Sequence, residues 1–367
     1  MQYFIAGILA VLGLKIKKSK ILFVILFCFM WLLFGWNRWN ADYYGYQQTY
    51  YSIGSYNVFY EYFEQFEIGY RYFCRFMFSL GVDYDTFLII YSLIGLLLIG
   101  STIIKFTNKP GYVLALYFIY PFLMDIVQIR NFMAMAFIIF GIRYLFSSRK
   151  VDQFKYVFFV FLAASFQSVG LFYLILLFAK MQSVKKLVNW VSLITAFLVF
   201  MLFLMKSGYS IPFVGSVSYF STKTSIITRI GYFFYFIIGF QLVRFSYKQI
   251  RDNIHEKEVT DLCTQEDLII IKIADVIYKM NIIILSVYPL LFFSVDFIRL
   301  YRNILPISYI LFSIAVTQSK NEKMIIFKIA TIVFLFFSEW LFAYYMSGSD
   351  VFYPIFEQNH IFNFFKK

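Results

Sequence analysis

Arginine is concentrated on one side of the membrane that the apolar runs of this chain predict. Sorting the 33 Lys and Arg residues by those runs places 22 on the inner side, 18 of them Lys, and 11 on the outer side, 7 of them Arg. The outer arginines are Arg38, Arg71, Arg75, Arg130, Arg229, Arg299 and Arg302. Basic residues on the inner side are expected of any inner-membrane protein, but arginine on the outer side is not. Because a guanidinium binds carboxylate or phosphate through paired hydrogen bonds, the outer face is predicted to hold an anion.

Arg130 is the outer arginine whose surroundings most directly suggest a site. It begins a long apolar run, Asn131 follows it, and Asp125 and Gln128 stand just before it. One interpretation is a clamp on a diphosphate group. The other is an interfacial arginine whose side chain reaches out to the lipid headgroups.

Other outer charges also have two interpretations. Glu67 and Arg71 are four residues apart in a stretch with helical periodicity, so they could form an ordinary surface pair worth about 0.3–0.5 kcal/mol. Asp296 precedes Arg299 and Arg302 at a spacing of three, so it could simply pair with Arg299. Either pairing would occupy a charge that a substrate site needs.

The first long outer loop is rich in tyrosine. Tyr43, Tyr44 and Tyr46 could stack on sugar rings, although about half of the tyrosines in such a chain are expected to lie in the interfacial belts. Arg38 and Asp42 of the same loop could bind substrate or could only position the loop.

Several other chemistries are disfavoured. The only histidines, His255 and His360, lie outside the predicted membrane helices, which argues against Ser-His-Asp catalysis, a His-rich metal site and an acyltransferase with a buried histidine. Three cysteines give neither a disulfide framework nor a metal-binding spacing, and there is no Gly-rich phosphate loop. Asp83-Tyr84-Asp85 has the spacing of a site for a metal and a nucleotide sugar, but it falls on the outer side, where nucleotide sugars are absent. The alternative is a cap for the next helix. We expect no metal and no cofactor.

The composition predicts an all-α, polytopic membrane protein. Hydrophobic residues make up 61% of the chain and charged residues 14%, and the mean hydropathy is +0.73. A soluble protein of this length could not bury so much apolar surface, and the apolar runs have the length of helices rather than of barrel strands. We attribute the net charge of +13 to inner loops that meet anionic lipid, not to nucleic acid. The predicted spans are roughly 2–14, 21–36, 86–104, 110–126, 131–147, 187–205, 229–246, 280–294, 304–317 and 324–345.

The segment 154–179 is apolar but interrupted at Phe166-Gln167-Ser168, so it is either one long span or a hairpin of two short helices. Basic residues flank both ends, which favours a hairpin whose ends both lie on the inner side. Counting it as two helices gives about twelve membrane helices in a single membrane domain, 1–367, with both termini outside.

Three connecting segments are long enough to carry structure of their own. Residues 37–85 are predicted to be a long outer loop with a helix lying on the membrane surface at about 58–80. Residues 206–228 are predicted to form an outer loop, and residues 247–279 a solvated cytoplasmic loop with an amphipathic end.

Five short elements carry a resemblance to a known family. In chain order they are Arg38-Trp39-Asn40-Ala41-Asp42-Tyr43-Tyr44, Glu67-Ile68-Gly69-Tyr70, Gln128-Ile129-Arg130 with Asn131-Phe132-Met133-Ala134, Phe166-Gln167-Ser168, and Arg299 with Arg302 before Tyr309. They resemble the early Arg/Asp/Tyr element, the acidic-x-Gly-Tyr motif, the Ile-Arg-x-x-x-Ala helix start, the Phe-His-x-Ser element and the C-terminal Arg-rich turn of the EpsG family of bacterial polysaccharide polymerases, which are Wzy-type proteins. Gln167 stands where the family usually has His. Glutamine cannot act as a base, but it can donate a hydrogen bond to a substrate.

The resemblance implies a GT-C-like architecture and a polymerase that joins oligosaccharide repeat units carried on undecaprenyl diphosphate, at the periplasmic face of the bacterial inner membrane. On this basis Arg130, together with Arg299 or Arg302 and with Arg71 as a further candidate, would bind the diphosphate. Glu67 or Asp42 would take the acceptor proton, and the residues expected at the sugars are Tyr70, Gln167, Asn131 and Arg38. The implied partners are the lipid-linked oligosaccharide, the bilayer, a flippase and a chain-length regulator.

Other classes of protein stay open. A flippase for lipid-linked oligosaccharides would also bind a diphosphate, but it should carry charges along a path through the bilayer. Apart from Asp125 at the end of the span 110–126, the only acid that the predicted spans contain is Glu339. A ligase would use the same donor at the same face. A scaffold or sensor would explain the topology but not the outer arginines.

Overall fold

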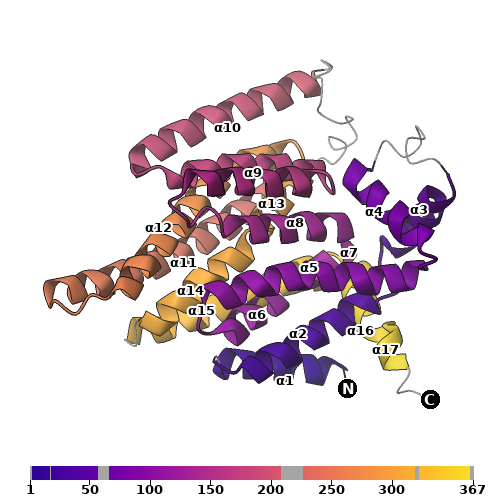
Figure 1. Ribbon diagram of the computed structural model, residues 1–367, viewed down its shortest axis with the longest axis horizontal. Coiled ribbons are helices and arrows are strands. Elements are labelled where there is room, and N and C mark those ends of the chain that lie inside the picture. Colours follow the sequence, from indigo (N-terminus) through magenta and orange to yellow (C-terminus); the bar gives the residue numbers. More distant parts are fainter. Residues whose placement is uncertain (1, 17, 57–65, 208–225, 319–321, 364–367) are drawn as a thin grey trace. The chain divides into compact units, whose positions relative to one another are not determined.

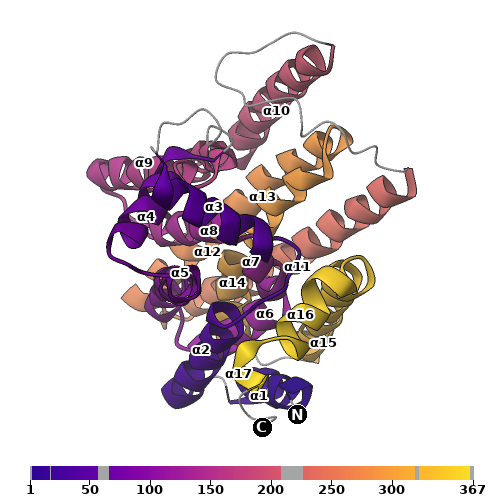
Figure 2. The same cartoon turned by 90° about the vertical axis from the view of Figure 1, so that its right-hand side faces the viewer.

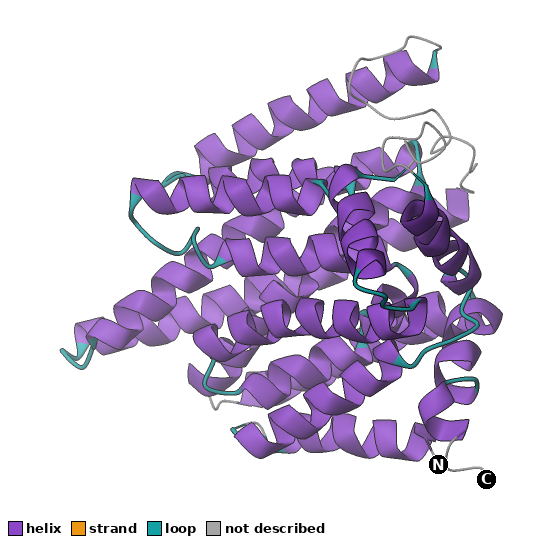
Figure 3. Cartoon of the chain, turned by 45° about the vertical axis from the view of Figure 1, so that its right-hand side comes forward, coloured by secondary structure: helices purple, strands orange, loops and turns teal. Residues whose placement is uncertain are grey.

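The computed structural model describes residues 2–16, 18–56, 66–207, 226–318 and 322–363. Within these residues the chain is helical and forms no strand (Figure 3). The chain divides into two compact units. One consists of residues 1–173 and 321–367, and the other of residues 174–320.

The first unit contains most of the helices (Figure 1). Its α-helices are α1 (Gln2–Lys15), α2 (Lys20–Gly35), α3 (Tyr43–Ser55), α4 (Ile68–Ser79), α5 (Tyr84–Phe106), α6 (Pro110–Ile119), α7 (Phe122–Val127), α8 (Ile129–Ile142), α9 (Lys150–Ala164), α15 (Glu322–Glu339), α16 (Tyr353–Glu357) and α17 (His360–Asn363). Two π-helical stretches, η6 (Trp340–Tyr345) and η7 (Gly348–Phe352), connect α15 to α16. Helix α8 packs between α5 and α9, and α2 packs on both α5 and α6. Every residue of α6 is buried, as expected of a helix that is apolar all round.

The second unit holds α10 (Val184–Lys206), α11 (Ile226–Val259), α12 (Gln265–Ile284), the 3-10 segments η4 (Leu285–Phe292) and η5 (Val295–Phe297), α13 (Ile298–Arg302) and α14 (Leu305–Gln318). Helices α11 and α12 form a hairpin. A capping box of Thr264 and Asp267 starts α12, and Lys257 of α11 reaches the same Asp267 carboxylate at 2.6 Å. The predicted loop 247–279 is therefore mostly helical. Its position on the cytoplasmic side stays a prediction.

The helices bear out the membrane character more firmly than the predicted number of spans. Among the described residues, five helices are long and apolar enough to cross a membrane, and five more apolar helices are shorter. The long ones cover Tyr84–Phe106, Val184–Lys206, Thr228–Val259, Val295–Gln318 and Glu322–Tyr345. The count of about twelve is not confirmed because backbone breaks shorten several predicted spans. The run 110–126 is split into α6 and α7 beside Pro121, and the run 280–294 changes from α-helix to 3-10 helix around Pro289.

The predicted hairpin in 154–179 is present. Helix α9 ends at Ala164, and a 3-10 helix, η2 (Ser168–Lys180), follows. The Tyr156 hydroxyl donates a hydrogen bond of 2.7 Å to the Tyr173 carbonyl, 17 residues further on. A continuous helix would hold these residues about 25 Å apart. The chain therefore reverses at Gln167, as the sequence predicts.

The segment 37–85, predicted to be a long outer loop, is more helical than expected. Helix α4 coincides with the second half of the predicted helix at 58–80, whereas residues 57–65 lie outside the described part. Helix α3 was not predicted. It packs on α4 near the start of α5 (Figures 1 and 2), and the Tyr50 hydroxyl donates to the Val82 carbonyl at 2.6 Å. Most of the predicted loop 206–228 also lies outside the described residues.

Candidate active site

The candidate active site begins with an ion pair between two predicted site residues. An Nη1 of Arg130, at the start of α8, lies 2.6 Å from Oε2 of Glu67, just before α4. Both side chains are largely buried, 18% and 15% exposed, and 63 residues separate them in the sequence. Glu67 is thus bonded to Arg130, a pairing that the i,i+4 interpretation with Arg71 does not include.

The second oxygen of the Glu67 carboxylate binds the hairpin turn. Oε1 accepts a hydrogen bond of 2.8 Å from the backbone N–H of Ser168, the first residue of η2. One carboxylate therefore joins the starts of α4 and α8 to the turn that contains Gln167.

The contacts of Gly69 explain why the motif has a glycine two residues after Glu67. Its N–H and that of Tyr70 both donate to the Ser165 carbonyl, at 2.7 and 3.2 Å. A Cβ at position 69 would lie 2.8 Å from that same carbonyl oxygen and would overlap the Ser165 hydroxyl. Only glycine lets α4 approach the hairpin turn this closely.

Aromatic rings surround the Arg130 guanidinium. Its Cζ lies 4.8 Å from the centre of the Phe66 ring and 6.0 Å from that of the Tyr46 ring. The Tyr46 ring in turn meets that of Tyr70, which is fully buried. Such rings favour a desolvated cation.

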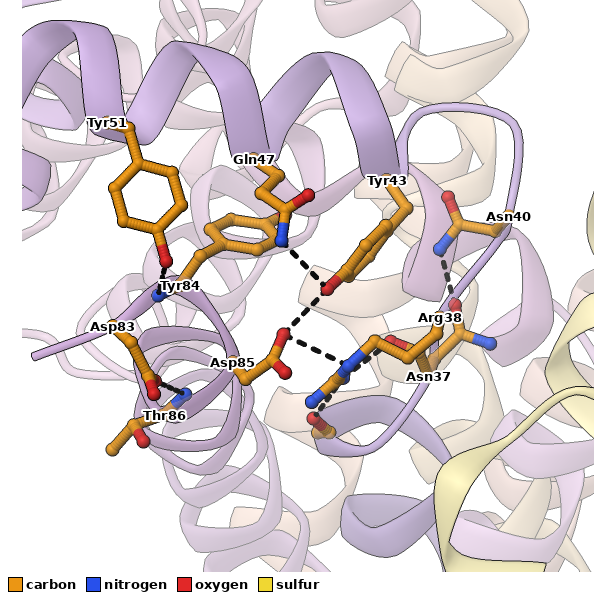
Figure 4. Close-up of polar contacts among 11 residues, drawn as sticks. Asn37, Arg38, Asn40, Tyr43, Gln47, Tyr51, Asp83, Tyr84, Asp85 and Thr86 are labelled. Carbon is orange, nitrogen blue, oxygen red and sulfur yellow. Dashed lines mark hydrogen bonds and ion pairs between the residues drawn. The ribbon is translucent and has the colours of Figure 1, made fainter. Parts of the chain in front are cut away.

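Arg38, predicted to contact sugar, forms a second ion pair in the same unit (Figure 4). Its Nε lies 3.0 Å from an Asp85 oxygen that also accepts a 2.6 Å hydrogen bond from the Tyr43 hydroxyl. Its Nη1 donates to the carbonyls of Gly35 and Asn37, at 3.2 and 2.7 Å. Burial and the hydrogen bond to Asp85 raise the pKa of Tyr43 above its ordinary value. Arg38 thus fastens its own loop to α5.

The acidic pair around Tyr84 has structural partners. Asp83 caps α5, because its carboxylate accepts a 2.7 Å hydrogen bond from the Thr86 N–H, and this backbone bond lowers the pKa of Asp83. Asp85 pairs with Arg38. Within the residues that the structure describes, no group of three or more His, Cys, Asp or Glu could hold a metal ion.

Four other predicted residues lie around these pairs in the first unit. Asn131 is buried beside Arg130, Gln167 is buried in the hairpin turn, and Arg71 is half-buried one turn after Glu67. Asp42 is exposed at the start of α3, without a side-chain cap bond. These positions agree with a site around Glu67, but no contact decides their roles.

The two late arginines belong to the second unit. Arg299 pairs with Asp296 at 2.7 Å within one helical turn, the simple pairing that the sequence left open. Arg302 is buried. Their assignment to the same diphosphate as Arg130 stays a prediction.

Sequence reasoning missed three contributors to the site. Ser168 acts through its backbone N–H, which has no signature in residue type. Phe66 is one of many aromatics in an aromatic-rich chain. Tyr46 was considered for sugar stacking, and its contact with Arg130 could have been suspected only if α3 had been expected.

The family model for the EpsG family matches residues 20–356, from the start of α2 into α16. The chain belongs to the EpsG family. Comparisons with curated proteins and with solved structures give no match. The EpsG match spans the Glu67–Arg130 and Arg38–Asp85 pairs, and it supports a role like that of a polysaccharide polymerase.

Proposed function

We propose that this EpsG-family protein polymerises oligosaccharide repeat units carried on undecaprenyl diphosphate, at the outer face of the bacterial inner membrane. The Glu67–Arg130 pair carries the proposal. It places a carboxylate and a guanidinium, the two groups that metal-free glycosyl transfer from a diphosphate needs, in contact at 2.6 Å in a largely buried setting.

The pair suggests how binding of the donor prepares the base. A diphosphate carries more negative charge than a carboxylate, so it competes with Glu67 for the forked donors of Arg130. When Arg130 turns to the diphosphate, Oε2 of Glu67 is released while Oε1 still accepts from the Ser168 N–H. The carboxylate then stands ready, in a fixed orientation, for the acceptor hydroxyl.

The transfer itself then needs no further reactant. The acceptor oxygen bonds to C1 of the donor sugar as the bond between C1 and the diphosphate oxygen breaks. The acceptor proton passes to Glu67, and the electron pair leaves with the diphosphate, whose growing charge Arg130 stabilises. Energy comes from the donor bond, so the reaction uses no nucleotide.

The other candidates have supporting roles in this proposal. Tyr70, Asn131 and Gln167 line the surroundings of the pair and would orient the sugars, and Asp42 is the second choice for the base. Arg71, in the same unit as Arg130, would be the further ligand of the diphosphate. A flippase and a chain-length regulator would act before and beside the polymerase.

The decisive experiment replaces Arg130. Arg130→Lys keeps a positive charge for Glu67 but removes the fork, so polymer should fall strongly while the protein stays folded. Arg143→Lys is the matched control, because Arg143 contacts Ser101 and Thr102, away from the pair. The amount of polymer is measured on gels in two systems. One is cells that lack the native gene and express the variant, and the other is purified protein supplied with lipid-linked repeat units. Full polymerisation by both Arg130→Lys and Arg130→Ala would show that Arg130 is not needed to bind the diphosphate.

The deletion phenotype separates the alternative classes. Loss of a polymerase leaves single repeat units on the lipid acceptor, loss of a flippase leaves none outside, and loss of a ligase leaves free polymer on the lipid carrier. A deletion strain without single repeat units would overturn the proposed function.

A further inference from the structure

Trp39 stands apart from its neighbours in the loop that joins α2 to α3. Asn37, Arg38 and Asn40 are buried, whereas the Trp39 side chain is 59% exposed. Its backbone has a φ of +69°, in the left-handed region that a bulky side chain rarely adopts. The loop thus holds a large ring outward at the cost of backbone strain, a combination that is typical of functional positions.

The rest of the loop is bonded tightly enough to enforce this conformation. The Asn40 side chain donates to that of Asn37 and accepts from the Asp42 N–H at 3.0 Å, and the Ala41 N–H donates to the Asp350 carbonyl at 3.0 Å. None of these bonds needs an indole at position 39. Glycine would fit the same backbone without strain.

The exposed indole is part of a pair of rings. Trp39 lies nearly parallel to Tyr44, with centroids 6.4 Å apart and an interplanar angle of 27°, and Tyr44 is 57% exposed. Trp39 also meets the Tyr43 ring at 6.5 Å. Asp42, an exposed residue, lies between Trp39 and Tyr44 in the sequence. Two exposed aromatic faces are suited to a sugar, whose C–H face packs on a ring while its hydroxyls stay available for hydrogen bonds to polar groups nearby.

Helix α3 connects these rings to the ion pair. The Tyr43 ring meets that of Trp39, and the Tyr46 ring, one turn later, lies 6.0 Å from the Arg130 Cζ. One turn of helix is about 5 Å, close to the length of one sugar residue. The exposed rings therefore lie within a few sugar residues of the Glu67–Arg130 pair.

We propose that Trp39 and Tyr44 form a platform that binds a sugar residue of the oligosaccharide chain a short distance from the reacting bond. The identity of the ligand, a sugar, rests on the proposed function, whereas the arrangement of the two rings does not. An alternative for an exposed tryptophan at a helix end is an anchor in the lipid interface. That alternative predicts no effect of Trp39 on sugar binding.

The test measures binding rather than turnover. The probe is a set of labelled oligosaccharides released by partial hydrolysis from the polysaccharide of the host cell, titrated against the full chain in nanodiscs. Trp39→Gly keeps the loop conformation and removes the ring, so its affinity should fall about tenfold, as should that of Tyr44→Ala. Trp39→Phe should restore most of the affinity. Trp340→Ala, which removes another exposed tryptophan of the same unit, should bind as the wild type does.

The outcomes are separable from those of the proposed function. Unchanged binding by Trp39→Gly, or no binding by the wild type, would overturn the platform whatever Arg130→Lys does to polymerisation. Loss of binding in Trp39→Gly together with full polymerisation by the Arg130 variants would keep the platform and reject the clamp. Size-exclusion profiles in detergent show that each variant is folded.

Discussion

Two of the arginine–carboxylate pairs of the first unit, Arg38–Asp85 and Arg130–Glu67, could not be told apart from the sequence. Arg38 pairs with Asp85 and also donates to two carbonyls of its own loop, those of Gly35 and Asn37. Arg130 instead contacts Glu67, a residue of a different segment, whose other oxygen holds the turn of a third. The Arg38–Asp85 pair fixes a local loop, whereas the Glu67 carboxylate of the second pair connects three segments of the chain.

This difference separates two uses of arginine in the first unit. A guanidinium that is bonded to nearby backbone carbonyls stabilises the fold and could leave them only if the loop unfolded. A guanidinium paired with a carboxylate of a distant segment can exchange that partner for a stronger anion without unfolding a loop. The anion site predicted from the arginine distribution is therefore best placed at Arg130, and Arg299, paired within one helical turn, resembles Arg38 more than Arg130.

The largest expected effect comes from Glu67→Gln compared with Asp85→Asn. Glutamine keeps an oxygen for the Ser168 N–H but cannot take a proton, so polymer formation should fall by about 10²–10⁴-fold. Asp85→Asn, which changes the other pair in the same way, should cause no comparable loss. Polymer per unit of folded protein is the measurement. Equal effects of the two changes would show that the pairs do not differ in function.

Arg38→Ala should act on stability instead of chemistry. It removes a charge-assisted bond to Asp85 and two bonds to loop carbonyls, so we expect a loss of about 1.5–3 kcal/mol in the free energy of unfolding. Thermal unfolding in detergent measures the loss, with Arg130→Lys as the control that should unfold near the wild-type temperature. If Arg38→Ala melts at the wild-type temperature but forms no polymer, Arg38 contacts the substrate instead of stabilising the loop.

Gly69→Ala tests the backbone contact between α4 and the hairpin turn, which positions Glu67. The new methyl group would lie 2.8 Å from the Ser165 carbonyl oxygen, so α4 must shift from the hairpin turn at a cost of about 1–3 kcal/mol. Gly45→Ala is the control, since a Cβ there meets nothing within 4 Å and alanine favours the helix. Polymer should fall in the first variant only. Equal yields would mean that the Glu67 position tolerates this shift.

The fold class could be predicted because its cause is local. Apolar runs of helical length indicate membrane helices wherever they occur, and the basic residues at both ends of 154–179 indicated its reversal correctly. Breaks inside helices were harder to predict. Around Pro121 and Pro289 the runs stay apolar, so hydropathy alone continues each predicted span through the break. Helix α3 was missed because its sequence is polar and tyrosine-rich, and its stability comes from packing on α4 and α5.

The site shows a similar limit. The sequence placed Glu67, Arg130 and Gln167 among the candidates, since their residue types suit the chemistry. It could not predict that Glu67 binds Arg130, because that contact joins segments 63 residues apart. It also could not show that Arg38 is bonded within its own loop, since backbone carbonyls accept hydrogen bonds at every position.

The smallest expected effect distinguishes the two acids beside Tyr84. Asp83 only caps α5, so Asp83→Ala should cost about 1 kcal/mol at neutral pH, whereas Asp83→Asn keeps the cap. The hydrogen bond from the Thr86 N–H lowers the pKa of Asp83 below 3.8, so the charge-dependent part of this stabilisation is complete above that pH and is lost as the pH falls through the folded-state value. The gap in melting temperature between the wild type and Asp83→Ala should therefore narrow on acidification, while the gap between Asp83→Asn and Asp83→Ala stays constant. A constant gap for the wild type as well would mean that the Asp83 charge adds nothing to the cap, and that an asparagine would serve α5 equally well.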